Sequence, residues 1–116
     1  TKEPDKPDSL DDLSFILYDL LQTEYLEESQ ALAGEIQNSM VKSLRTRDRG
    51  IDQAGFFMLN KVFMPSVLIE VAFISNKHEE TLLKKDSFRQ KAAEGIYRGI
   101  KNFIDKYSPD SYKTDR

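Results

Sequence analysis

The most apolar stretch of the chain runs from Pro65 to Asn76, and its residues alternate between the two sides of an extended backbone. One side would carry Val67, Ile69, Val71 and Phe73, and the other Leu68, Glu70, Ala72 and Ile74. Because both sides are mostly apolar and β-branched residues are frequent, the pattern predicts a strand buried on both faces. Residues 55–59 predict a second, shorter strand. Since two strands alone make a weak sheet, we infer that further strands lie outside this sequence.

Four segments place apolar residues at the three- and four-residue spacing of α-helices. They are approximately residues 9–22, 23–45, 76–83 and 86–107. Ser9, Thr23 and Asn76 stand at the starts of the first three, where a side-chain oxygen can accept a hydrogen bond from a free backbone N–H group. The fourth contains Gly95 and Gly99, one turn apart, which predict that this helix closely approaches the sheet.

The first of these helices is apolar on more than one face, because Phe15 and Tyr18 widen its leucine stripe. Packing on both sides of the stripe is one interpretation, and contact with a partner or with a missing part of the domain is the other. The polar ends of the chain show no such pattern. Residues 1–8 predict a disordered linker and residues 108–116 a flexible tail, which leaves residues 9–107 as the folded part.

Glu70 is the one ionisable residue in the apolar stretch. An ionised, unpaired carboxylate in a buried strand would cost on the order of several kcal/mol. The compensation could be an ion pair with one of the nearby Arg45, Arg47 or Arg49, protonation of the acid, or an active-site cleft at the end of the strand. The residue pattern alone leaves these three alternatives open.

A family resemblance bears on this choice. Pro65–Asn76 resembles the catalytic strand of the zinc-dependent N-acetylmuramoyl-L-alanine amidases, in which Pro-Ser, an apolar run, Glu and a later Phe-x-Ser-Asn follow one another. The segment 49–59 is similar to the family's preceding strand, and segments 79–83 and 88–100 are similar to its closing helices. The similarity extends from about Asp11 to Tyr107.

The resemblance implies an α/β fold, with a mixed sheet between helices in three layers, here incomplete at about two strands and four helices. It implies that zinc-activated water cleaves the amide bond between N-acetylmuramic acid and L-alanine of the stem peptide, with Glu70 as general base. In the family, two His and one Glu in the first half of the domain hold the zinc. This chain has one histidine, His78, which follows the catalytic strand, so we expect no metal ligand here and no activity from this chain alone.

The resemblance also suggests partners and a location. Arg49 and Asn76 are candidate substrate-binding residues, because an arginine fits the carboxylates of a stem peptide. Peptidoglycan is the implied substrate and a regulatory activator protein a further implied partner, in the periplasm or the extracellular envelope of a bacterium. The alternative is a non-catalytic module, truncated or degenerate, that binds the cell wall or a partner.

Composition further limits the class of protein and the kinds of site that the chain can form. The chain has 116 residues, 39% of them hydrophobic and 32% charged, as in an ordinary globular domain or part of one. The net charge of −3 gives no excess of basic residues for binding nucleic acid. No apolar run is long enough to span a bilayer. The absence of cysteine excludes disulfides and thiolate metal sites.

Overall fold

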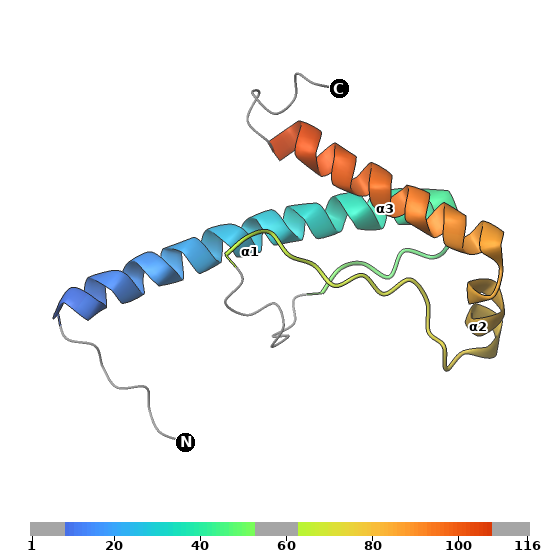
Figure 1. Cartoon of the computed structure of the whole chain (residues 1–116), viewed down its shortest axis with the longest axis horizontal. Coiled ribbons are helices and arrows are strands. Elements are labelled where there is room, and N and C mark those ends of the chain that lie inside the picture. Colours follow the sequence, from blue (N-terminus) through green and yellow to red (C-terminus); the bar gives the residue numbers. More distant parts are fainter. Residues whose placement is uncertain (1–8, 53–62, 108–116) are drawn as a thin grey trace.

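The computed structural model describes residues 9–52 and 63–107, and the side chains of all of these except residues 9–11. In these ranges the chain forms three helices, α1 (Ser9–Leu44), α2 (Lys77–Leu83) and α3 (Asp86–Tyr107) (Figure 1). The long helices α1 and α3 cross one another, and the short α2 leads into α3. The predicted linker 1–8, tail 108–116 and strand 55–59 lie outside the described residues.

The predicted mixed α/β sheet is wrong for the part of the chain that is described, which contains helices and no strand. Residues 67–73 run as an extended segment (Figure 1), as the alternation predicts, yet they form no ladder with any other described segment. A strand is defined by hydrogen bonds to another strand, and residues 9–52 and 63–107 supply no partner for one. The backbone is therefore strand-like in conformation without being part of a sheet.

The two helices predicted for residues 9–22 and 23–45 are one continuous helix of 36 residues. Thr23 does not cap a second helix, because its Oγ1 donates a hydrogen bond to the carbonyl of Asp19, 2.9 Å away, inside the helix. No proline interrupts this stretch, so nothing stops the helix there. α1 ends at Leu44, as predicted, where Arg45 takes up a left-handed conformation with φ of 52°.

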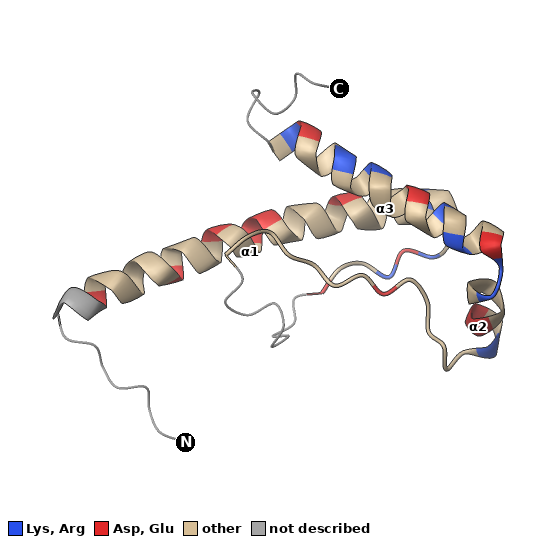
Figure 2. Ribbon diagram, in the orientation of Figure 1, with Lys and Arg blue, Asp and Glu red and all other residues tan. Residues whose placement is uncertain are grey.

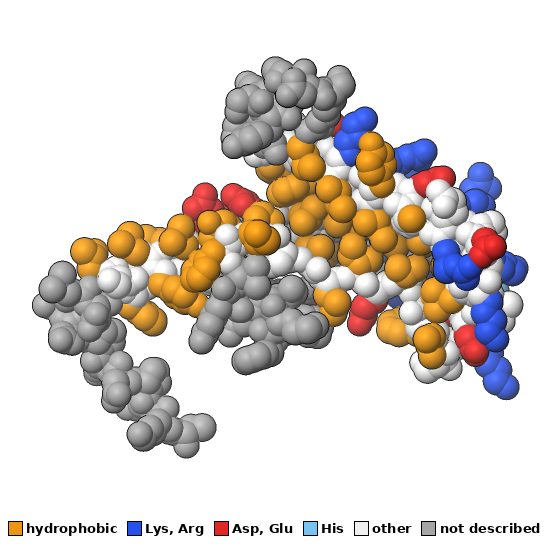
Figure 3. Space-filling model, in the orientation of Figure 1, with side chains coloured by type: hydrophobic (Ala, Val, Ile, Leu, Met, Phe, Trp, Pro, Cys, Tyr) orange, Lys and Arg blue, Asp and Glu red, His pale blue; other side chains and the backbone are white. Residues whose placement is uncertain are grey.

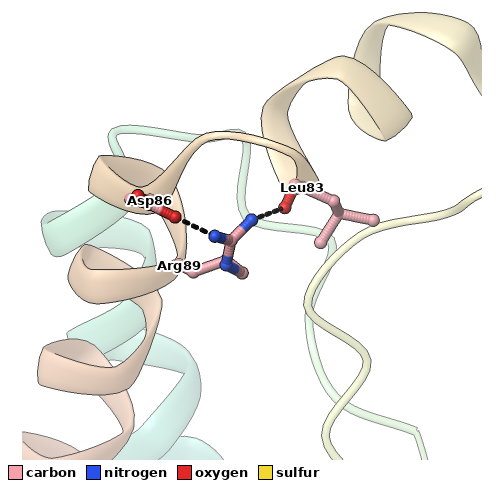
Figure 4. Close-up of polar contacts among 3 residues, drawn as sticks. All are labelled: Leu83, Asp86 and Arg89. Carbon is pink, nitrogen blue, oxygen red and sulfur yellow. Dashed lines mark hydrogen bonds and ion pairs between the residues drawn. The ribbon is translucent and has the colours of Figure 1, made fainter.

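The predicted short helix and C-terminal helix are confirmed. Asn76 Oδ1 accepts a hydrogen bond from the N–H of Glu79 at 3.1 Å, which caps the start of α2. Arg89 joins α2 to α3, because its guanidinium donates to the carbonyl of Leu83 at 2.6 Å and also contacts the Asp86 carboxylate (Figure 4). The first contact satisfies a free carbonyl at the end of α2, and the second pairs the guanidinium with a carboxylate at the start of α3.

α3 packs antiparallel against α1 through its glycines. A Cβ built on Gly95 would lie 3.0 Å from Cα of Met40, and one on Gly99 would lie 2.4 Å from Cα of Ile36. The expectation of a close approach is thus correct, but the approach is to α1 and not to a sheet. Among residues 9–52 and 63–107, the buried hydrophobic core consists of Ile36, Met40 and Ala92.

Two polar contacts also join α1 to α3. Ser43 Oγ donates to the carbonyl of Lys91 at 2.6 Å, and Lys106 Nζ lies 2.6 Å from Glu35 Oε1. The apolar seam between these contacts is small. The α1–α3 pair therefore depends on the close backbone contact that its glycines permit.

The extended segment lies against this pair by one face only. Val67, Ile69 and Val71 pack on the α1–α3 core, while Leu68 and Glu70 are exposed. The expectation that both faces are buried is wrong for the described residues, because no second layer covers the outer face.

The first half of α1 extends beyond α3, and hydrophobic side chains are exposed along it (Figures 1 and 3). Leu13, Leu17 and Leu20 are each more than half exposed. None of the three described helices combines the length and the apolar character that a membrane span requires.

Candidate functional site

An open groove of about 1260 Å³ runs along α1. Its other walls are formed by loop residues between 46 and 52, by the extended residues between 64 and 73, and by the start of α2. Glu70, Arg49, Asn76 and His78 all line it. The structure thus brings Glu70 and both candidate substrate-binding residues to one groove.

Glu70 belongs to the outer face of the extended segment and is exposed to the groove. Its two neighbours in the chain, Ile69 and Val71, are packed on the helical core and fix the backbone at this position. Among the described ion pairs none involves Glu70, so the interpretation of a structural pair with Arg45, Arg47 or Arg49 has no support in this part of the chain. The expected burial of the carboxylate is also wrong, since no outer layer covers it here.

Arg49 lies on the loop that follows α1. Its guanidinium carbon is 5.6 Å from the centre of the Phe73 ring, within the range of a cation–π contact. This contact joins the loop to the end of the extended segment. A guanidinium held in this way keeps donors available for a carboxylate.

Asp48 fixes the loop that carries Arg49, a role that the sequence analysis missed. Its Oδ1 accepts hydrogen bonds from Gln37 Nε2 at 3.0 Å and from the N–H of Gly50 at 2.8 Å. The bond from Gln37, and after it that from Gly50, lowers the pKa of the Asp48 carboxyl below its usual value. The Asp-x-Gly spacing is a turn signal that could have indicated this residue.

Ser29 is a second positioning residue that the sequence analysis missed. Its Oγ accepts a hydrogen bond from the N–H of Ser66 at 2.9 Å, which attaches the start of the extended segment to α1. The two residues are far apart in the chain, so no local pattern predicts this contact.

The side-chain oxygen of Asn76 caps the start of α2, and the residue also lines the groove. This residue therefore orients the end of the extended segment and the start of α2. Its Nδ2 group can still donate a hydrogen bond to a molecule in the groove.

The described residues do not fit a zinc site. No group of three His, Cys, Asp or Glu side chains in residues 9–52 and 63–107 is placed to hold a metal ion. His78 is an exposed residue of the first turn of α2.

Comparison with known proteins identifies the chain's relatives. An uncharacterized protein of Bacillus subtilis, YqiI, is 41% identical over 80 residues, which cover 69% of this chain and 39% of that protein. The N-acetylmuramoyl-L-alanine amidase AmiA of Salmonella typhimurium is 37% identical over 92 residues, or 79% of this chain and 32% of the amidase. The N-acetylmuramoyl-L-alanine amidase LytC of Bacillus subtilis is 40% identical over 75 residues, 65% of this chain and 15% of the amidase.

The chain thus spans less than two-fifths of the length of these relatives. No solved structure matches it. The family model described as N-acetylmuramoyl-L-alanine amidase matches residues 14–102, which include Glu70, Arg49 and Asn76. On this match over most of its length, the chain belongs to the N-acetylmuramoyl-L-alanine amidase family.

Proposed function

We propose that this chain is part of a peptidoglycan hydrolase that cleaves the amide bond between N-acetylmuramic acid and the L-alanine of the stem peptide. The observation that supports this most is the position of Glu70, a carboxylate of the family-matched region that is exposed on an open groove. Peptidoglycan is the proposed substrate and a bacterial cell envelope the proposed location. A regulatory activator protein is a further proposed partner.

Glu70 would act as the general base and then as the general acid. Its carboxylate would accept a proton from the attacking water and pass that proton to the amine nitrogen that leaves with L-alanine. This role requires a carboxylate that is held in place. The packing of Ile69 and Val71 on either side of it provides a fixed backbone.

Arg49 and Asn76 would bind the substrate. The guanidinium of Arg49 would pair with a carboxylate of the stem peptide, and the cation–π contact with Phe73 would limit its motion. Asn76 would donate from its Nδ2 group, because its side-chain oxygen is already bonded to the N–H of Glu79. The zinc that the family uses would have to be held by residues outside the described part of the chain.

A chimera tests this function. Residues 9–107 would replace the matched region of a full-length amidase relative, and the chimera would be incubated with purified peptidoglycan. We expect new N-terminal alanine to appear together with free lactyl carboxylate on the muramic acid. Release of reducing sugar ends or of other amino termini in place of alanine would refute the assigned bond.

The alternative function is a non-catalytic module that binds the wall or a partner. The absence of a metal-ligand group among the described residues favours it for the chain alone. Calorimetric titration of the chain with zinc separates the two. Tight binding of one zinc ion would contradict the incomplete site, whereas no binding together with retention on peptidoglycan would support the module.

A further inference from the structure

Exposed leucines form a stripe along the first half of α1. Leu13, Leu17 and Leu20 follow one another at helical spacing and are 58%, 54% and 62% exposed, respectively. None of the three lines the groove that contains Glu70. This leucine stripe is therefore an apolar surface separate from the candidate site.

α3 has an apolar face of its own in addition to the one that packs on α1. Tyr97, Ile100 and Ile104 share this face at helical spacing, and together with Lys101 they line an open hollow of about 230 Å³. Tyr97 is 65% exposed. The glycines of α3, which contact α1, occupy the other side of the helix. We name Tyr97, Ile100 and Ile104 the outer face of α3.

The leucine stripe and the outer face of α3 are bordered by charges of opposite sign. Residues 9–41 contain no Lys or Arg, so the charged side chains of this part of α1 are all acidic (Figure 2). Asp12 and Glu24 are exposed before and after the stripe, and Arg98 and Lys101 are exposed beside the outer face. Within the described part of the chain, none of these four residues forms an ion pair. The two surfaces are thus complementary in charge, and both are apolar.

One chain cannot bring its own two surfaces together. The glycines of α3 contact α1 at Ile36 and Met40, whereas the leucine stripe lies on the part of α1 that extends beyond α3 (Figure 1). At 1.5 Å per residue, Leu17 and Ile36 are separated by about 28 Å along the helix axis. The outer face of α3 can therefore meet a leucine stripe only on another molecule.

We infer that two copies of this chain associate reciprocally, with the leucine stripe of each copy packed on the outer face of α3 of the other. A two-fold axis makes the same contact twice, so that each copy provides one stripe and receives one. Burial of the apolar side chains stabilises the contact. Charge selects the pairing, because α1 against α1 would place acidic residues opposite acidic residues. The inference does not depend on the proposed function, since both surfaces lie outside the groove.

Sedimentation of the full chain gives the first test. We expect a species of twice the 13.4 kDa of one chain, in equilibrium with the monomer. Leu17→Asp should leave the helical circular dichroism unchanged and yield a monomer, because this exposed side chain is buried only in the dimer. A chain that stays monomeric at about 100 μM, far above the dissociation constant of a specific dimer, would overturn the inference. So would a monomeric chain in which Leu17→Asp is destabilising only within the chimera, because the stripe would then contact the rest of an amidase domain.

Two charge-reversed chains test which surfaces meet. The first carries Asp12→Lys and Glu24→Lys beside the leucine stripe, and the second carries Arg98→Glu and Lys101→Glu beside the outer face of α3. Each alone should dimerise at least about tenfold more weakly, because both contacts of its symmetric dimer become repulsive. Mixed in equal amounts, they should form a heterodimer within about threefold of the original affinity, because opposite charges then meet at both contacts.

A matched control separates this effect from net charge. Lys77→Glu with Lys85→Glu changes the net charge as much as the second chain does, at exposed positions outside both surfaces, and should leave dimerisation unchanged. If the second chain dimerises as the unaltered chain does, or if the mixture forms no heterodimer, α1 does not pack on α3 of the other copy and the inference is overturned.

Discussion

Replacement of Gly99 by alanine tests how the two long helices are held together. The new Cβ would lie 2.4 Å from Cα and 2.8 Å from N of Ile36, both backbone atoms of α1. Ordinary contact begins at 3.4 Å, so the helices would have to separate by about 1 Å at this point. The obstructing atoms belong to the backbone, and no side-chain rotation can relieve the clash.

The expected cost follows from two opposing effects. Alanine gains about 1 kcal/mol of helix propensity over glycine, but overpacking of a close contact costs typically about 1–3 kcal/mol, and the buried contacts of Ile36, Met40 and Ala92 weaken as the helices part. We expect the overpacking to prevail, with a net loss of about 1–2 kcal/mol. For a domain of this size that corresponds to a melting temperature lower by about 5–15 °C.

The assay is urea unfolding followed by far-ultraviolet circular dichroism, with a matched control. Gly34 lies inside α1, where a Cβ would meet nothing within 4 Å, so Gly34→Ala should stabilise the chain by about 0.5–1 kcal/mol. If Gly99→Ala is as stable as the unaltered chain, or more stable, the close α1–α3 contact does not exist in solution.

Two further predictions concern a cap and an ion pair. Asn76→Ala should speed amide exchange in α2 by about fivefold, equivalent to about 1 kcal/mol of lost capping, whereas Asn76→Asp should not; equal exchange in both variants would contradict the cap. The hydrogen bond and charge of Glu35 raise the pKa of Lys106 above 10.5, so this pair stabilises the fold fully below pH 10.5 and ceases to do so as the pH rises through the folded-state pKa. The urea midpoint should fall in that range, and Lys106→Met should reduce the fall; an unchanged pH profile in the variant would refute the contribution.

Local signals predicted the helices well. Asn76 indicated the start of α2, because a cap depends on a side chain and an N–H group only three residues apart. Thr23 led to a wrong helix start, because a local signal does not show which of two hydrogen bonds the side chain makes. A threonine can cap a helix or bond back to the preceding turn, and only the continuity of the surrounding helix decides between them.

Non-local features were predicted in part. The alternation in residues 67–71 correctly indicated which side chains share a face, since Val67, Ile69 and Val71 pack together. It could not supply a hydrogen-bonded neighbour, because strand pairing depends on a second segment. Gly95 and Gly99 likewise indicated a close approach, but the predicted element, the sheet, was wrong, because the helix approached is α1.

The sequence suggested which residues belong to the candidate site, but not how exposed they are or which groups they contact. Glu70, Arg49 and Asn76 were proposed from the sequence as site residues, and all three line the groove. Their exposure and partners depend on the whole fold, so the expected burial of Glu70 was wrong. The contact of Ser29 with Ser66 joins distant segments, so only the fold reveals it, whereas the turn at Asp48 has a local signal in the Asp-x-Gly spacing.

The most direct test of the account is the rate of amide hydrolysis by the chimera before and after Glu70→Gln, with bound zinc and the melting temperature measured on the same samples. A general base predicts a rate lower by at least about a hundredfold, with metal content and melting temperature unchanged. An unchanged rate, or a variant that loses its fold along with its activity, would contradict the assignment of Glu70 as the group that moves the proton.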